Sequence, residues 1–290
     1  MSKLLLPLVL LFVSLNCFGV TPTPEEIKEY RHGATQGNAV DQYLLGAAYD
    51  HGWGGVPEDD REAVKWFRRA AEQGDAEAQY NLGSMYANGE GVPEDGTEAV
   101  KWYRKAADQG LAIAQYNLGV TYDTGEGVAE DNAEAVKWFR KAAEQGLADA
   151  QYNLGVAYDF GEGIPEDDTE AVKWYRKAAE QGESKAQYNL GGMYVNGEGA
   201  PEDFTEAIKW FRNSAEQGEA KAQFNLGVFY ANGDGVREDN VLAYMWWKLA
   251  AAQGHEVAKK NKGIISERMT KEQIAEAQKM SREWLAKRQD

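Results

Sequence analysis

The sequence predicts an all-α protein, an α-solenoid built from antiparallel helix pairs. The first observation is a repeat, because the dipeptide Gln-Gly returns every 36 residues from Gln73 to Gln253. The second is that each copy holds two amphipathic segments separated by glycine-rich turns. The third is that the two ends of the array differ from its inner copies, as the ends of a solenoid must. Six full copies in a row therefore indicate one array rather than separate domains.

Composition and charge exclude several classes of protein. The chain has 290 residues, of which 27% are charged, and its formal net charge is −16 at pH 7. Binding to a phosphate backbone would need a concentrated basic face, and such an acidic balance argues against one. The single Cys excludes an internal disulfide and a thiolate metal site. We therefore expect neither a nucleic-acid-binding protein nor a zinc module.

Residues 1–19 have the pattern of a secretory signal peptide. A short basic start precedes a mostly apolar run that ends at Leu15, which is shorter than the roughly 20 apolar residues of a membrane-spanning helix. Small residues at Cys17 and Gly19 predict cleavage after Gly19, and hence export to the periplasm or secretion. The alternative is a lipoprotein anchored through Cys17. A small residue usually precedes a lipidated Cys, whereas Asn16 precedes Cys17 here. The sequence therefore favours cleavage over lipidation.

The predicted helices follow in order. Residues 20–37 hold a short lead-in helix, and residues 38–254 hold six repeats. Each repeat consists of a first and a second helix. In the second copy the apolar face of the first helix is formed by Ala78, Leu82, Met85 and Tyr86. The glycine-rich run after Asn88 ends this helix, and Pro93 cannot continue it.

The second helix of that copy should begin near Asp95, because Asp95 and Glu98 have the capping-box spacing. Its apolar stripe is broad, since it must pack on its own partner and on the next repeat. The stripe consists of Ala99, Val100, Trp102, Tyr103, Ala106 and Ala107. Gly83 in the first helix lacks a Cβ, so the two helices can approach closely.

Residues 255–290 form a predicted C-terminal cap. The second helix of the last copy is more apolar than its equivalents and needs a cover. A final amphipathic helix from Thr270 to Leu285 supplies it, with Thr270 and Gln273 as a capping box. This segment carries nine basic and six acidic side chains. One explanation of this excess of basic side chains is that they serve packing and solubility. The alternative is that the cap is a docking site for an acidic partner or a membrane surface.

The repeated motifs resemble a known family. The patterns Ala-x-Ala-Gln-Tyr-Asn-Leu-Gly-x-x-Tyr, Gly-x-Gly-Val and Ala-Val-Lys-Trp-Tyr-x-Lys-Ala-Ala-x-Gln-Gly look like the Sel1-like repeat, a relative of the tetratricopeptide repeat. The resemblance covers residues 38–254. It implies a right-handed superhelix of antiparallel helix pairs whose first helices line a concave groove. It also implies an envelope scaffold, a regulator, a secreted host-interaction protein or an effector-immunity protein.

Residues that usually carry catalysis form no recognisable constellation. His32, His51 and His255 occupy unrelated repeat positions without helical metal spacing. Nucleophile elbows, zinc-binding helices and phosphate-cradling loops are missing from the sequence. We therefore expect no enzymatic activity, no cofactor and no metal. Acidic pairs such as Glu94-Asp95 recur in successive loops, but calcium needs roughly six to eight converging oxygens, so helix capping explains them better.

The strongest functional signal is an aromatic column at one position of the first helices. Tyr80 lies roughly 160° from Leu82 on a helical wheel, and packing against a neighbouring helix is the alternative to exposure. Matched onto the tetratricopeptide pattern, the position faces the groove. Aromatic rings supply contact area at low entropic cost. We therefore predict a partner-binding column formed by Tyr43, Tyr80, Tyr116, Tyr152, Tyr188 and Phe224.

Positions beside this column vary from copy to copy while the framework stays constant. One of them holds Val40, Glu77, Ile113, Asp149, Lys185 and Lys221. Another holds Asp50, Ala87, Asp123, Asp159, Val195 and Ala231. A variable groove on a constant framework is what partner recognition needs. Among these residues we predict partner contacts for Glu77, Asp123, Asp159, Lys185 and Lys221.

These features predict a non-enzymatic, exported interaction protein that binds a protein or an extended peptide in its groove. Its acidic field would favour a basic partner. A scaffold or regulator of an envelope process fits best, and neutralisation of a toxic effector is a narrower variant. Binding of glycan or peptidoglycan is the alternative, because aromatic faces stack on sugar rings. We further expect a monomer without a transmembrane helix in the mature chain.

Overall fold

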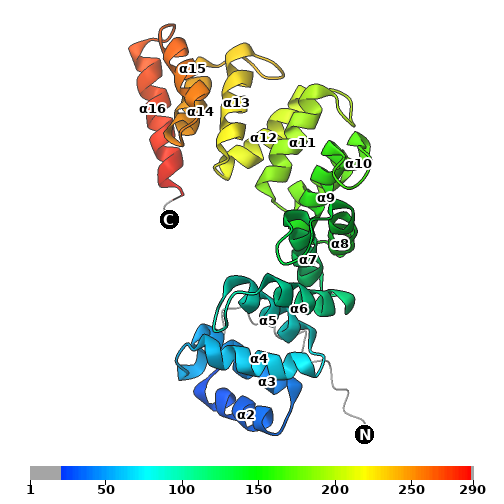
Figure 1. Ribbon diagram of the computed structural model, residues 1–290. Helices are drawn as coiled ribbons and strands as arrows, with labels where there is room; N and C mark the ends of the chain where they lie inside the picture. The colour runs from blue at the N-terminus through cyan, green and yellow to red at the C-terminus, as the bar shows by residue number, and fades with distance from the viewer. Residues whose placement is uncertain (1–20, 289–290) are drawn as a thin grey trace, which may run out of the picture. The chain divides into compact units, whose positions relative to one another are not determined.

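The computed structural model describes residues 21–288, and every regular element in that range is a helix. The predicted signal peptide of residues 1–19, including Cys17, lies outside the described residues. The chain divides into two compact units, Met1–Asp131 and Asn132–Asp290, whose helices are labelled in Figure 1. None of the described helices is long and apolar enough to cross a membrane.

In the first unit each helix packs on the one that precedes it in the chain. The predicted lead-in helix is α2, which is longer than expected and has a capping box of Thr23 and Glu26. Helices α3, α5 and α7 are first helices, and α4 and α6 are second helices. The bounds are α2 Pro24–Thr35, α3 Ala39–His51, η1 Trp53–Gly55, α4 Asp60–Glu72, α5 Ala76–Asn88, α6 Gly96–Asp108 and α7 Ala112–Thr124.

The second unit continues the same alternation through α14. Helices α9, α11 and α13 are first helices, and α8, α10, α12 and α14 are second helices. Helix α14 packs against both α15 and α16. The bounds are α8 Asn132–Glu144, α9 Ala148–Phe160, α10 Asp168–Glu180, α11 Ser184–Asn196, α12 Phe204–Glu216, α13 Ala220–Asn232, α14 Asn240–Ala252, α15 Glu256–Ser266 and α16 Lys271–Ala286.

Local chemistry fixes the ends of the helices as the sequence predicts. Gly89 adopts a left-handed conformation with φ of 74° and ends α5, because a residue without Cβ takes this conformation without strain. The Asp95 carboxylate then accepts a hydrogen bond from the Glu98 N–H at 3.0 Å and begins α6. The acidic residues of these loops therefore act as helix caps, as Asp59, Asp167, Asp203 and Asp239 also do.

The core of each pair lies between its first and second helix. Ala78, Leu82, Ala99 and Ala106 are almost fully buried between α5 and α6. A Cβ on Gly83 would lie 2.7 Å from the Tyr103 ring, a distance at which the ring or a helix would have to move. The predicted close approach of the two helices at this glycine is therefore confirmed.

The cap contains one helix that the sequence analysis missed. The predicted final helix is present as α16, with the capping box of Thr270 and Gln273. Before it, α15 is a shortened seventh first helix. Ala258 and Gly263 stand 36 residues after Ala222 and Gly227 of α13, and Ala258 is buried like Ala222. This retained spacing is the signal that could have revealed α15.

Candidate partner-binding face

The aromatic column consists of half-buried side chains on the first helices. In four copies the ring packs against the aromatic residue of the second helix in the same pair. The centroid distances are 5.8 Å for Tyr43–Phe67, 5.9 Å for Tyr80–Tyr103, 6.0 Å for Tyr152–Tyr175 and 5.7 Å for Tyr188–Phe211. Phe224 instead stacks on His255 at 4.5 Å, and Tyr116 is also half-buried.

The tyrosine hydroxyls of the column link neighbouring repeats. Burial raises the pKa of Tyr80, and a hydrogen bond with Asn117 of the next first helix offsets part of that rise. Burial likewise raises the pKa of Tyr188, with a further rise from the Glu219 charge and an opposing hydrogen bond with Asn225. Each ring therefore has a packed edge and an accessible edge. The wheel alone did not show this, because a first helix has packed neighbours on more than one side.

Two of the predicted contact residues at the variable positions, Glu77 and Asp123, belong to the first unit. Glu77 is half-buried, and burial followed by the nearby Asp75 charge raises its pKa. Asp123 is exposed on α7, and partial desolvation and then the Glu130 charge raise its pKa. A raised pKa means that an approaching cation would stabilise these carboxylates.

The second unit holds the other three predicted contact residues of the variable positions. Asp159 accepts a hydrogen bond from the Tyr175 hydroxyl at 2.9 Å, so it also supports the fold. Its pKa is raised by burial, against the effect of that hydrogen bond. Lys185 and Lys221 are exposed on α11 and α13, and no ion pair found among the described residues involves either side chain. The first unit therefore offers Tyr43, Tyr80, Tyr116, Glu77 and Asp123, and the second offers Tyr152, Tyr188, Phe224, Asp159, Lys185 and Lys221.

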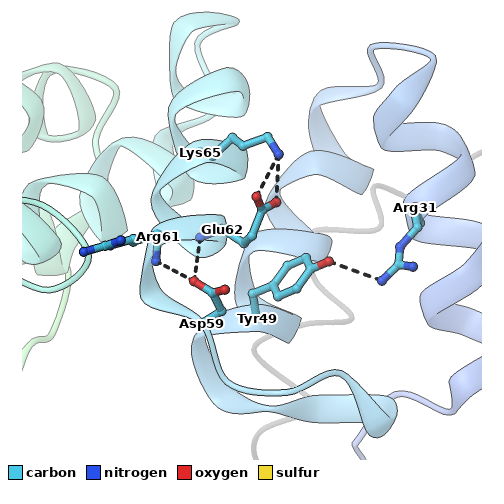
Figure 2. A network of polar contacts seen from close by, with 6 residues as sticks. All are labelled: Arg31, Tyr49, Asp59, Arg61, Glu62 and Lys65. Atoms are coloured by element: carbon cyan, nitrogen blue, oxygen red, sulfur yellow. Dashed lines mark hydrogen bonds and ion pairs between the residues drawn. The ribbon is translucent and has the colours of Figure 1, made fainter.

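A second contact series between repeats was not predicted from the sequence. In each copy a Tyr hydroxyl of the first helix accepts a hydrogen bond from an Arg that lies 18 residues earlier, in the preceding helix. Figure 2 shows the first of these pairs, Arg31 and Tyr49, at 3.3 Å, beside the Asp59 cap and the Glu62–Lys65 ion pair. The later pairs are Arg68–Tyr86, Arg104–Tyr122, Arg140–Tyr158, Arg176–Tyr194 and Arg212–Tyr230. The constant spacing was the available signal.

The family model for the Sel1 repeat matches six consecutive stretches of the chain, namely residues 39–75, 76–111, 112–147, 148–183, 184–219 and 220–255. The chain is a Sel1 repeat protein. Its Sel1 repeats coincide with the helix pairs described above, and α15 begins immediately after the last of them.

Two solved structures are similar to this Sel1 repeat chain with more than 30% sequence identity. One is c5321, a protective antigen present in uropathogenic Escherichia coli strains that displays an SLR fold, with 41% identity and a TM-score of 0.81 over 89% of this chain. The match spans only 56% of the length of that chain. The other is a Sel1 repeat protein from Oxalobacter formigenes, with 36% identity, a TM-score of 0.65, and coverage of 78% of this chain and 93% of that chain.

Immunity protein Pa5087 from Pseudomonas aeruginosa is a more distant likeness. It is 22% identical, with a TM-score of 0.40 over 74% of this chain and 81% of that chain, which is too weak to bear on function. No curated protein matches the chain. Sel1 repeat proteins are generally non-enzymatic protein-interaction scaffolds, and the resemblance predicted from the motifs is confirmed.

Proposed function

We propose that this protein is a non-catalytic, exported scaffold that binds a protein or an extended peptide on the face formed by its first helices. The observation that carries the proposal is the contrast between a constant framework and variable side chains beside it. The tyrosines of the column repeat, whereas Glu77, Asp123, Lys185 and Lys221 change from copy to copy. Membership of a family of interaction scaffolds supports the same function.

The partner that we propose is basic in the segment that meets the first unit. Glu77 and Asp123 are both ionisable groups whose pKa is raised, so a neighbouring cation removes an electrostatic cost. The net charge of −16 would also accelerate the approach of a basic partner. An envelope regulator fits this description, and an immunity protein against a basic effector is a narrower version of the same proposal.

The test is capture of partners from a native envelope fraction by matched variants. The binding variant is Glu77→Gln with Asp123→Asn. The control is Glu72→Gln with Asp108→Asn, which removes the same charge from exposed positions at the ends of α4 and α6. We expect the binding variant to retain its main partner about tenfold less well, a loss of about 1.4 kcal/mol, and the control to behave like the native protein. Equal capture by all three proteins would contradict the proposed face.

The tyrosine column is a poorer first probe. Its rings pack on second helices and its hydroxyls contact the next repeat, so truncation of Tyr80 would disturb folding together with binding. The accessible edges of the same rings favour glycan as the second candidate ligand. Titration with soluble peptidoglycan fragments would then change the tyrosine and tryptophan fluorescence in a saturable way. An unchanged spectrum would remove this candidate.

Export is proposed on the N-terminal pattern alone. Intact mass spectrometry of the protein from its native host should give a chain that starts at Val20. An acyl group on Cys17 would instead establish a lipoprotein. Sedimentation of the purified mature protein tests the monomer that we propose.

A further inference from the structure

The Arg–Tyr series ends abruptly at the last repeat. The residue 36 positions after Arg212 is Lys248, and the residue 36 positions after Tyr230 is Ser266. The Ser266 hydroxyl donates to the Gly263 carbonyl at 2.6 Å, so it does not replace the tyrosine hydroxyl that every earlier copy provides. Lys248 is nevertheless half-buried in α14. A cation is thus retained at a position where its usual partner is missing.

Two other cations are near enough to Lys248 for their charges to lower its pKa. Lys262 is on α15, one turn before Ser266, at the position where Leu226 is fully buried in the previous copy. Arg282 is on α16, one turn after Gln278. The Gln278 side chain contacts the Tyr244 hydroxyl at 3.5 Å, and the Trp246 and Trp284 rings meet at 6.3 Å. These contacts align α16 parallel to α14, and Arg282 therefore lies beside Lys248, which is one turn after Tyr244.

None of the three cations forms an ion pair among the described residues. Burial and then the charges of Arg282 and Lys262 lower the pKa of Lys248, and no acidic group opposes them. In the same cap Lys259 pairs with Glu256, and Lys279 pairs with Glu283. Three clustered positive charges in a strongly acidic protein are therefore left for an external anion.

We propose that Lys248, Lys262 and Arg282 form a binding site for a phosphate group. A phosphate monoester is largely a dianion at pH 7, so it can neutralise most of a site of three positive charges. The arginine fork matches two phosphate oxygens, while each lysine contributes a point charge with rotatable donors. Inorganic phosphate carries a similar charge at pH 7, whereas the phosphodiester of an anionic lipid headgroup carries one negative charge. All three offer the site the same kind of acceptor oxygens. The site combines α14 of the last repeat with α15 and α16 of the cap, and it is independent of the partner-binding face proposed above.

Calorimetric titration of the full mature chain with inorganic phosphate tests the site. Low ionic strength is needed, because salt screens such contacts. We expect saturable binding at one site for the native protein and at least about tenfold weaker binding for Lys248→Gln with Arg282→Gln, since each lost charge-assisted hydrogen bond has a large effect. The single variant Lys262→Gln should also weaken binding. The control Lys279→Gln removes a charge from the same helix α16 and should change the affinity less than about twofold.

Vesicle sedimentation distinguishes the two sources of phosphate. The full chain is mixed with vesicles of phosphatidylglycerol and, separately, with vesicles of phosphatidylcholine. Binding to the first kind alone, lost in Lys248→Gln with Arg282→Gln, would identify a lipid headgroup. Binding of inorganic phosphate without binding to vesicles would identify a free phosphate compound. Absence of both, or equal losses in the Lys279→Gln control, would overturn the proposal, provided that the variants melt like the native protein.

Discussion

At the scale of single residues, the recurrent Gln-Gly dipeptide is explained by a ladder of buried amides. The Gln79 side chain is 4% exposed and donates to the Ala71 carbonyl at 3.0 Å, at the end of the preceding second helix. Its oxygen accepts a hydrogen bond at 2.8 Å from Gln109, which belongs to the Gln-Gly turn of the same pair. One side chain thus joins two repeats and closes one pair. The sequence showed the recurrence but not its role, because the two glutamines are 30 residues apart.

Replacement of Gln79 by Leu should lower the free energy of unfolding by about 1–3 kcal/mol, because it removes both hydrogen bonds of a buried amide, one to the Ala71 carbonyl and one from Gln109. Urea unfolding followed by circular dichroism measures the change. The comparison variant Gln109→Leu removes only one of these two hydrogen bonds, from its exposed end, and should therefore cost less than Gln79→Leu. A larger loss in Gln109→Leu than in Gln79→Leu would contradict the ladder.

At the scale of helices, caps and apolar stripes were predictable because they depend on residues close together in the chain. Asp95, Thr270 and the lead-in helix were predicted on that basis, and the structure confirms them. Helix α15 was missed because its apolar pattern is broken, with Lys262 at the position of a core leucine. The packing of the tyrosine rings was not predictable from one helix, since it depends on the second helices that flank it.

Replacement of two adjacent glycines in α11 by alanine should change the stability of the protein in opposite directions. A Cβ on Gly191 would lie 2.8 Å from the Phe211 ring, whereas a Cβ on Gly192 would meet nothing within 4 Å. We expect Gly191→Ala to destabilise the protein by about 1–3 kcal/mol through overpacking. Gly192→Ala should stabilise it by up to about 1 kcal/mol, because alanine has the higher helix propensity. Thermal melting of both variants measures the difference, and equal shifts would show that the close approach at Gly191 is unimportant.

At the scale of the whole molecule, the repeat architecture was predictable and the division into two compact units was not. The 36-residue period is visible in the sequence, but the boundary after Asp131 separates α7 from α8, two helices of one Sel1 repeat. The sequence around that boundary keeps the ordinary repeat pattern, so no local signal marks it. Charge, by contrast, acts over the whole chain and gives a prediction at this scale.

Mild acidification should stabilise the protein. Burial raises the pKa of Asp75, Glu77, Asp123 and Asp159 above the ordinary values of 3.8 and 4.5. The folded state therefore binds protons before the unfolded state does, and stability increases as the pH falls from 7 through the folded pKa values toward about 4.5. Relief of the repulsion within a chain of charge −16 acts in the same direction. A melting temperature that decreases steadily as the pH is lowered from 7 to about 4.5 would contradict the expectation.

The contacts between successive repeats also determine where the chain can gain or lose length. Arg68 donates a hydrogen bond to Tyr86, and Gln79 donates one to the Ala71 carbonyl. The next copy supplies equivalent side chains at the same spacing. A duplicated inner repeat would thus enter with compatible surfaces on both sides, and unequal recombination between neighbouring copies would yield foldable products. After α14 this compatibility ends, because Lys248 and Ser266 no longer form the matching pair. The cap therefore ends the array, because no further repeat can pack after it in the same way. We expect natural variation in repeat number to arise before the cap in the sequence.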